Sequence, residues 1–333
     1  MSKILICYGT RPEYLKILSL AKKLPKKNFK LLYVKQHNHL LKGNKFDYKI
    51  NITKKNKNRL NLIFQNIFGK FNFSQFKHVL VQGDTATALG CALAAYNYNI
   101  KIIHLEAGLR TYDKNNPYPE EAYRQIISRI ADIHLCPTKL SKNNLIKENI
   151  RENIFVVGNS ALDNLLPLKK KATYSNIILI TLHRREKLNE MKQWFKELNK
   201  IAKKFDKLKF IFPIHANPQI QSLKKYLTSV NIIEFLPHNE LLELMIKSKF
   251  LITDSGGIQE EGSFFNKKII VCRKYTERPE GINSGHLIMC KKIKYLEKLV
   301  YRLNKNFSIR QPSPYGDGKT ALKIIKLYNE KKF

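Results

Sequence analysis

Residues 250–261 read Phe-Leu-Ile-Thr-Asp-Ser-Gly-Gly-Ile-Gln-Glu-Glu, an apolar run that passes through a Ser-Gly-Gly turn into a helical pattern. Such a turn exposes free backbone N–H groups, and the helix dipole adds partial positive charge, so the turn suits a phosphate or diphosphate. Ser255 can cap the helix and donate to a phosphate oxygen, while Gly256 and Gly257 let a ligand approach the backbone closely. Glu261, about one turn into the helix, can accept from both hydroxyls of a ribose. The alternative is an ordinary strand–turn–helix, because short glycine motifs often match by chance.

The composition indicates a globular chain with a strongly basic surface. Its 333 residues suffice for two domains of ordinary size, and no apolar run reaches the roughly 18 residues that a transmembrane helix needs. The N-terminus lacks the layout of a signal peptide. The formal charge of +35 could indicate nucleic-acid binding, but the lysines are spread along every helix, which favours a lysine-rich surface without a specific nucleic-acid partner. A positive field would still attract an anionic nucleotide substrate.

The five cysteines are scattered, and most of them fall in apolar, strand-like runs. None forms a Cys-x-x-Cys pair, which argues against a zinc site. We expect buried, reduced thiols and therefore a cytoplasmic protein.

Strands alternate with helices along the whole chain, and this alternation predicts parallel sheets covered on both faces. The first series of predicted strands comprises Lys3–Tyr8, Phe29–Lys35, Lys77–Gln82, Lys101–Leu105, Ile133–Cys136 and Ile154–Val157. The second comprises Ile177–Thr181, Lys209–Pro213, Asn231–Phe235, Phe250–Ile252 and Lys268–Cys272. The Lys- and Asn-rich segment 42–61 reads as a loop that leads into a helix from about Arg59 to Phe68. We predict an α/β chain of two Rossmann-like domains with a cleft between them, residues 1–160 and 161–317, followed by a last helix at 318–333.

Charged residues follow the predicted strands, at the edge where open α/β sheets bind ligands. In the first series these are the carboxylates Asp84, Glu106 and Glu120 and the cations Arg11 and Lys16. Crowded carboxylates shift one another's pKa values and can exchange protons near neutral pH, although each could instead be a helix cap or first-turn residue. The second series offers cations at its own edge: His183, Arg184, Arg185, His215 and Arg278. Carboxylates on one side and cations plus a helix N-terminus on the other suit a nucleotide-sugar, with the diphosphate on the second domain.

Several motifs occur in one order from residue 3 to about residue 320: Gly9-Thr10-Arg11-Pro12-Glu13, Gly83-Asp84-Thr85, His104–Thr111, Pro119-Glu120-Glu121, His183-Arg184-Arg185-Glu186, Thr253–Glu261 and Thr276–Gly281. With these motifs the chain resembles the non-hydrolysing UDP-N-acetylglucosamine 2-epimerases. The resemblance implies a glycosyltransferase-B type fold with the active site in the interdomain cleft and a C-terminal helix that returns to the first domain. It also implies interconversion of UDP-N-acetylglucosamine and UDP-N-acetylmannosamine without NAD or metal, through elimination of UDP to 2-acetamidoglucal and re-addition. A homodimer is the expected assembly.

The resemblance also assigns roles to residues. The expected catalytic residues are Asp84, Glu106, Glu120 and His183. The expected substrate-binding residues are Arg11, Lys16, Gln36, His37, Arg184, His215, Ser255, Gly256, Gly257, Glu261 and Arg278. The sequence departs from the family at Asn38-His39, after Gln36-His37, and in a shortened segment that follows. In the family this region helps to bind a second, activating UDP-N-acetylglucosamine. These departures leave open whether activation is retained and which 2-acetamido sugar is used.

Three other activities fit the same residues. They are a 2-epimerase of a modified UDP-2-acetamido sugar, a hydrolysing 2-epimerase that releases UDP, and a glycosyltransferase of the same fold. The three carboxylates of the first domain favour the epimerase over the transferase, since a transferase needs an acceptor site.

Overall fold

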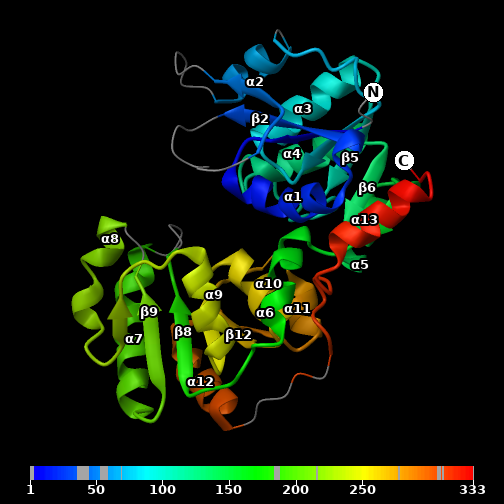
Figure 1. Cartoon of the computed structure of the whole chain (residues 1–333). Helices are drawn as coiled ribbons and strands as arrows, with labels where there is room; N and C mark the ends of the chain where they lie inside the picture. The colour runs from blue at the N-terminus through cyan, green and yellow to red at the C-terminus, as the bar shows by residue number, and fades with distance from the viewer. Residues whose placement is uncertain are drawn as a thin grey trace. The chain divides into compact units, whose positions relative to one another are not determined.

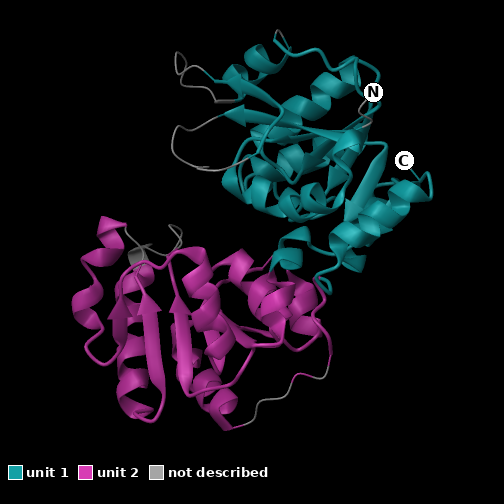
Figure 2. Ribbon diagram, viewed as in Figure 1, with its two compact units in different colours: residues 1–164, 316–333 teal, residues 165–315 magenta. Residues whose placement is uncertain are grey.

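The computed structural model describes residues 4–35, 45–52, 59–68, 70–183, 188–214, 217–276, 278–305, 309 and 311–332. Each half of the chain contains one parallel sheet with helices packed on it (Figure 1). The chain divides into two compact units, unit 1 with residues 1–164 and 316–333 and unit 2 with residues 165–315 (Figure 2). The predicted α/β class with two Rossmann-like domains is confirmed.

Unit 1 has a seven-stranded parallel sheet in the order β3-β2-β1-β4-β5-β6-β7, as far as its residues are described. Its strands are β1 (Ile4–Tyr8), β2 (Phe29–Lys35), β3 (Tyr48–Asn51), β4 (His78–Gln82), β5 (Lys101–Leu105), β6 (Ile133–Cys136) and β7 (Ile154–Val156). Its helices are α1 (Arg11–Lys23), α2 (Arg59–Phe68), α3 (Ala86–Asn97), α4 (Glu120–Ile130), α5 (Lys139–Lys147) and α13 (Thr320–Asn329).

Both faces of this sheet are buried. Alternate residues of each strand point to opposite sides, so one strand contributes to the cores on both faces. Leu5 and Cys7 of β1 pack in a core with α2 and α3, whereas Ile4, Ile6 and Tyr8 pack in a second core with α1 and α13. The last helix of the chain is therefore a structural part of unit 1. Asp163 fixes the start of α13, since its carboxylate accepts from the backbone N–H groups of Thr320 at 2.9 Å and Ala321 at 2.7 Å.

Unit 2 repeats the same order of strands, β10-β9-β8-β11-β12-β13. Its strands are β8 (Ile177–Thr181), β9 (Lys209–Pro213), β10 (Asn231–Ile233), β11 (Phe250–Thr253), β12 (Lys268–Val271) and β13 (Leu287–Met289). Its helices are α6 (Leu166–Lys169), α7 (Leu188–Lys204), α8 (Pro218–Gln221), α9 (His238–Lys247), α10 (Gly256–Phe264), α11 (Pro279–Asn283) and α12 (Leu296–Lys305). One face of the sheet packs on α7 and α12. Helix α10 packs close to Leu251 and Ile269, which point to the opposite face.

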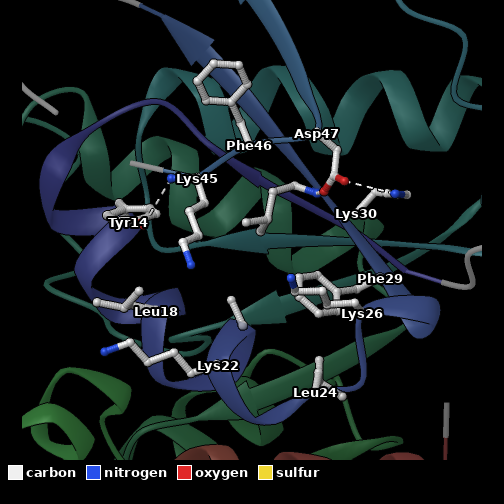
Figure 3. Close-up of a pocket in the computed structure, with 12 residues that line it drawn as sticks. Tyr14, Leu18, Lys22, Leu24, Lys26, Phe29, Lys30, Lys45, Phe46 and Asp47 are labelled. Atoms are coloured by element: carbon white, nitrogen blue, oxygen red, sulfur yellow. Dashed lines mark hydrogen bonds and ion pairs between the residues drawn. The ribbon is translucent and has the colours of Figure 1, made fainter. Parts of the chain in front are cut away.

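The sequence pattern missed several short elements. The segment predicted as a loop, residues 42–61, contains strand β3. This strand pairs in parallel with β2 and places Leu32 opposite Tyr48. The strand has a single buried residue, Ile50, so its alternation is too weak to recognise in the sequence. The residues just before it, Lys45–Asp47, lie beside helix α1 (Figure 3). Strand β13 and helix α12 were not predicted, and β10 ends at Ile233 rather than at Phe235.

Candidate active site

The first turn of unit 1 is held by a buried carboxylate, Glu13 of helix α1. Thr10 caps the helix, and Glu13 accepts in return from the backbone N–H groups of Gly9 at 3.0 Å and Thr10 at 2.6 Å, which completes a capping box. The second oxygen of Glu13 accepts from the hydroxyl of Thr85 at 2.6 Å, although Thr85 belongs to the turn after β4. Burial raises the pKa of Glu13. One side chain thus joins the two turns on which Arg11 and Asp84 lie.

Asp84 follows Gly83 at the end of β4 and pairs with an arginine from helix α4. Gly83 has a φ of +70°, a conformation that favours glycine. The Nε of Arg124 donates to Oδ2 of Asp84 at 2.7 Å, and Nη2 lies 2.7 Å from the same oxygen. The adjacent Thr85 caps helix α3 by accepting from the N–H of Ala88 at 3.1 Å. The pairing with Arg124 ties the turn after β4 to helix α4.

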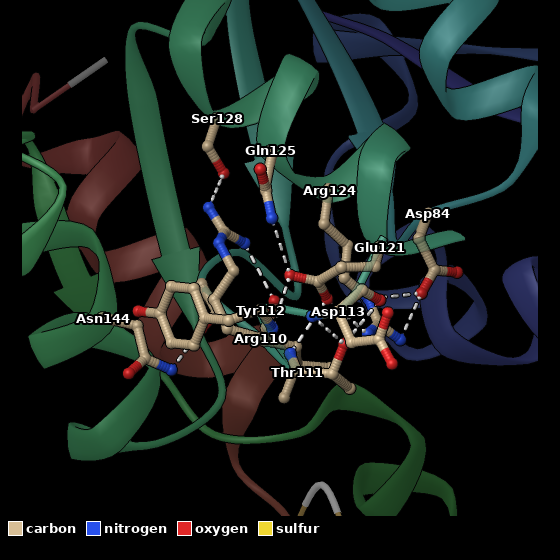
Figure 4. Close-up of polar contacts among 12 residues, drawn as sticks. Asp84, Arg110, Thr111, Tyr112, Asp113, Glu121, Arg124, Gln125, Ser128 and Asn144 are labelled. Carbon is tan, nitrogen blue, oxygen red and sulfur yellow. Dashed lines mark hydrogen bonds and ion pairs between the residues drawn. The ribbon is translucent and has the colours of Figure 1, made fainter. Parts of the chain in front are cut away.

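Arg124 is in turn held by Glu121, whose carboxylate is fully buried (Figure 4). Oε2 of Glu121 lies 3.2 Å from Nη1 of Arg124, and the carboxylate accepts from the backbone N–H groups of Thr111 and Tyr112 and from the amide of Gln125. Burial alone would raise the pKa of Glu121, but these hydrogen bonds and Arg124 lower it. Burial also opposes the charge of Arg124, yet Asp84 and Glu121 raise its pKa. The network therefore holds Asp84 in one position.

Glu106 follows β5 and is held by a lysine and an amide. Its backbone has a φ of +70°, and its side chain is paired with Nζ of Lys16 at 2.7 Å from Oε1 and 2.5 Å from Oε2. The amide of Gln82 also donates to Oε2. A Cβ added to Gly83 would lie 3.3 Å from Oε2, so Glu106 stands directly beside the turn that carries Asp84. Two cation-paired carboxylates therefore flank Gly83.

Glu120, at the start of α4, differs from both of them. Its Oε2 is buried and has no hydrogen-bond partner within the described part of the chain. Glu120 lines a cavity of about 400 Å³ together with Asp84 and Thr10; the other lining residues are Leu60, Thr85, Ala86, Pro119 and Tyr123. Within the described residues this buried oxygen is therefore left free to bind a polar group of a ligand in the cavity.

In unit 2, His183 follows β8 and contacts a buried aspartate at the end of β11. Its backbone N–H donates to the carboxylate of Asp254 at 3.0 Å, and its Nδ1 lies 3.7 Å from Oδ1. The Asp254 side chain is completely buried, whereas 38% of the His183 side chain is exposed. Asp254 therefore fixes the backbone of this turn, and the imidazole ring stays accessible to a ligand.

Helix α10 begins at Gly256, and its first turn differs from what the sequence suggested. Ser255 occupies the N-cap position but makes no side-chain cap hydrogen bond, so the prediction that its hydroxyl caps the helix is wrong. A Cβ on Gly256 would lie 2.6 Å from Nη1 of Arg278, whereas a Cβ on Gly257 would meet no atom within 4 Å. Arg278 is held by Glu260 at 2.7 Å. The first backbone N–H groups of a helix have no partner within the helix, and here the guanidinium of Arg278 lies beside them, an arrangement that suits an anion.

Glu261 lies on the same helix, and its Oε1 is 2.9 Å from Nε2 of His238. Thr276 donates to the side chain of Gln259 at 2.8 Å and accepts from the N–H of Arg278 at 3.2 Å. These contacts link the segment before α11 to helix α10 and keep the guanidinium of Arg278 beside Gly256.

The structure brings most of the predicted residues together within their own units. Five of them lie near the carboxyl edge of the unit 1 sheet: Arg11, Lys16, Asp84, Glu106 and Glu120. Six lie at the corresponding edge of unit 2: His183, Ser255, Gly256, Gly257, Glu261 and Arg278. Gln36, His37, Arg184 and His215 lie outside the described residues.

The sequence did not reveal the residues that hold this set in place: Glu13, Gln82, Glu121, Arg124 and Asp254. Three of them had a signal that could have been used. The pattern Thr10-x-x-Glu13 is that of a capping box, and Glu121 and Arg124 have the three-residue spacing of a helical ion pair. The partners of Gln82 and Asp254 come from other strands, so no local spacing indicates them.

Within the described residues, no helix is long and apolar enough to span a membrane. Within the same residues, no group of three or more histidines, cysteines or carboxylates could hold a metal ion.

Comparisons with known proteins agree with this geometry. A family model described as UDP-N-acetylglucosamine 2-epimerase matches residues 28–329. The UDP-N-acetylglucosamine 2-epimerase of Campylobacter jejuni is 38% identical, with 98% of this chain and 97% of the relative covered. A crystal structure of a putative UDP-N-acetylglucosamine 2-epimerase from Listeria monocytogenes is 30% identical and has a TM-score of 0.86, with 99% and 96% of the two chains covered. The UDP-GlcNAc 2-epimerase of Neisseria meningitidis bound to UDP-GlcNAc is 30% identical and has a TM-score of 0.83, with 98% and 100% covered. The likeness confirms the predicted glycosyltransferase-B type of fold.

Proposed function

The chain belongs to the UDP-N-acetylglucosamine 2-epimerase family, and from this membership we propose that it interconverts UDP-N-acetylglucosamine and UDP-N-acetylmannosamine at C2 without net hydrolysis. The observation that carries the proposal is the cavity of about 400 Å³ in which Asp84 and Glu120 meet at the carboxyl edge of the unit 1 sheet. An inversion at carbon needs groups that remove and return a proton, and this cavity offers them.

The proposed reaction proceeds by elimination and re-addition. A carboxylate accepts the C2 proton, a C1–C2 double bond forms, and the C1–O bond to UDP breaks, which gives 2-acetamidoglucal and bound UDP. A proton is then delivered to the opposite face of C2, and an oxygen of the UDP diphosphate attacks C1. No cofactor is consumed, since the bond electrons pass to UDP and return from it.

Proton removal from C2 is feasible only if the leaving diphosphate is stabilised, because this hydrogen is not acidic by itself. We assign that role to unit 2. Its donors are in place before the reaction begins. They are the N–H groups at the start of α10, the hydroxyl of Ser255, which makes no cap hydrogen bond, the guanidinium of Arg278 and the exposed ring of His183. Glu261 is assigned to the ribose.

The three carboxylates of unit 1 receive different roles in the proposal. Glu120, with a partnerless Oε2, transfers the C2 proton. Asp84 and Glu106, paired with Arg124 and Lys16, position the sugar or relay a proton on its second face. Arg11 and Lys16 add positive charge at the same edge.

An experiment in deuterated water tests the proposal. The protein is incubated with UDP-N-acetylglucosamine alone, and both the sugar product and the isotope at C2 are followed by NMR. We expect UDP-N-acetylmannosamine with deuterium at C2 and no accumulation of free UDP. Free UDP that rises with turnover would indicate a hydrolysing enzyme, and no reaction without an acceptor would indicate a glycosyltransferase. A panel of UDP-2-acetamido sugars identifies the preferred substrate.

We further propose that this epimerase is a cytoplasmic homodimer that supplies activated N-acetylmannosamine for surface polysaccharides. Among the described residues all five cysteines are buried free thiols, which supports a reducing compartment. Light scattering in solution measures the oligomeric state.

A further inference from the structure

A second pocket lies in unit 1, between helix α1 and the strand β2 (Figure 3). Its volume is about 600 Å³, within the range of small-molecule sites. Its walls come from the outer side of α1, from the chain around the start of β2 and from Lys45–Asp47. It shares no lining residue with the cavity that holds Asp84 and Glu120.

The wall formed by Lys45–Asp47 is held by hydrogen bonds rather than by packing alone. The hydroxyl of Tyr8 donates to the carbonyl of Lys45 at 2.7 Å, and the N–H of Lys45 donates to the hydroxyl of Tyr14 at 3.2 Å. Asp47 accepts from the N–H of Leu31 and from Nζ of Lys30, each at 2.9 Å. These hydrogen bonds hold this wall in place before any ligand arrives, which lowers the entropic cost of binding.

The lining separates into an apolar floor and a cationic rim. Leu18, Ala21, Leu24, Phe29 and Leu31 form the floor. Two further rings, Tyr14 and Phe46, line the wall, and 43% of Phe46 is exposed. An exposed ring beside an apolar floor is suited to stack on a flat ligand.

Four lysines complete the lining. Lys30 is paired with Asp47, whereas Lys22, Lys26 and Lys45 form no ion pair with an acidic side chain among the described residues. Figure 3 shows the Lys45 side chain pointing into the space between Tyr14 and Phe29. Three ammonium groups around one apolar floor, with one carboxylate that is already neutralised, leave the pocket strongly positive.

From this combination we propose that the α1–β2 pocket binds an organic phosphate that carries a flat ring, of the nucleoside diphosphate class. The ring lies on the apolar floor against Tyr14 or Phe46, and the phosphates are bound by Lys22, Lys26 and Lys45. The site is distinct from the one proposed for the epimerase reaction. The opposite side of the same helix carries Lys16, the partner of Glu106, so a bound ligand contacts the helix that positions an active-site carboxylate.

Binding is measured with ADP as the probe, on a Phe46→Trp variant that reports from the rim. The chain has a single native tryptophan, Trp194, which is buried in unit 2 and gives a constant background. We expect a saturable change in tryptophan fluorescence with ADP, and a much weaker response to adenosine or pyrophosphate alone. The measurement needs no epimerase activity, so its outcome is independent of the proposed reaction.

Charge-matched variants in the same background locate the site. Lys26→Glu is expected to weaken ADP binding roughly tenfold or more, since a hydrogen bond from a charged group is lost. Lys101→Glu, an exposed lysine of unit 1 outside the pocket, changes the charge equally and is expected to have little effect. Ala21→Trp fills the floor and should abolish binding.

Three outcomes would overturn the proposal. The first is an absence of saturable binding. The second is equal weakening by Lys101→Glu, which would indicate a general attraction by the basic surface. The third is a change of molecular mass in the pocket variants without ADP binding, which would make the pocket a contact between two copies.

Discussion

The two sheets have the same order of strands but different chemistry at their carboxyl edges. In both units the first strand lies beside the fourth, β1 beside β4 and β8 beside β11. An aspartate follows the fourth strand in each case. Asp84 keeps 26% of its side chain exposed beside a cavity, whereas Asp254 is fully buried and binds the backbone of His183. The same position in the fold thus borders a cavity in one unit and binds the backbone in the other.

The helix that follows the fourth strand shows the same division. In unit 1 Thr85 caps α3 with its hydroxyl, and Glu13 binds that hydroxyl from a neighbouring turn. In unit 2 Ser255 stands at the N-cap position, but its hydroxyl makes no cap hydrogen bond, and two glycines follow it. A satisfied helix start stabilises the fold, while an unsatisfied one keeps its N–H groups available to an anion. We infer that unit 1 transfers protons and unit 2 binds the diphosphate.

The largest expected effect separates two adjacent glutamates of unit 1. Glu120→Gln should lower turnover by at least about 100-fold, as for loss of a general acid or base. Most of the stability should remain, because Oε2 of Glu120 has no partner among the described residues. Turnover and thermal unfolding of the purified variant provide the measurement.

Glu121→Gln is the matched control. Glu121 is buried and holds Arg124 together with two backbone N–H groups, so breaking this network should cost about 3 kcal/mol of unfolding free energy. A Glu121→Gln protein as stable as the wild type, or a Glu120→Gln protein with near-normal turnover, would contradict the distinction between the two residues.

Two glycines of α10 test the diphosphate edge of unit 2. In each, an added Cβ meets an atom at 2.6 Å, but that atom belongs to Arg278 for Gly256 and to the core residue Leu251 for Gly262. Gly256→Ala should displace the guanidinium and reduce turnover roughly 10- to 100-fold with little loss of stability. Gly262→Ala should instead cost about 1–3 kcal/mol of stability while the folded fraction stays active. Steady-state kinetics and urea unfolding distinguish them, and the reverse pattern would count against the role of Arg278.

A smaller effect compares the two N-cap positions. Thr85→Ala removes a cap and leaves an oxygen of Glu13 without its donor, so it should cost about 1–2 kcal/mol. Ser255→Ala removes no cap hydrogen bond and should change stability by less than about 0.5 kcal/mol, but it should raise KM for the UDP-sugar. If both variants lose stability equally, Ser255 is a structural residue.

The smallest effect concerns pH and the turn at Gly83. Burial lowers the pKa of His104 from 6.5 to about 3, and its Nε2 contacts the carbonyl of Gly83 at 2.9 Å. Between these pH values the unfolded chain binds a proton at His104 that the folded chain does not. The contribution of His104 to the free energy of unfolding is therefore complete above pH 6.5 and is lost as the pH falls towards 3. His104→Gln should flatten the decline in stability by up to about 1.4 kcal/mol per pH unit. Urea unfolding across this range gives the slopes, and an unchanged slope would mean that His104 does not contribute.

The sequence predicted what local patterns encode. The Ser-Gly-Gly turn after an apolar run gave α10, and the alternation of strands and helices gave both sheets. Strand β3 was not predicted from the sequence, because only Ile50 of its four residues is buried. In the site, Asp84 and Glu106 were found from their positions after strands, but Arg124 and Lys16 as their partners were not. Those pairs join residues 40 and 90 positions apart, and only the folded sheet brings them together.

The affinity for UDP itself tests the division between the units most directly. Isothermal titration of UDP compares the wild type with Glu120→Gln in unit 1 and with Gly257→Ala in unit 2. The added methyl of Gly257→Ala meets no protein atom within 4 Å but occupies the approach to the α10 N-terminus. We predict that Glu120→Gln binds UDP with wild-type affinity and that Gly257→Ala binds it roughly tenfold more weakly, since a charge-assisted hydrogen bond is lost. Equal binding by Gly257→Ala and the wild type, or weaker binding by Glu120→Gln than by Gly257→Ala, would contradict the account.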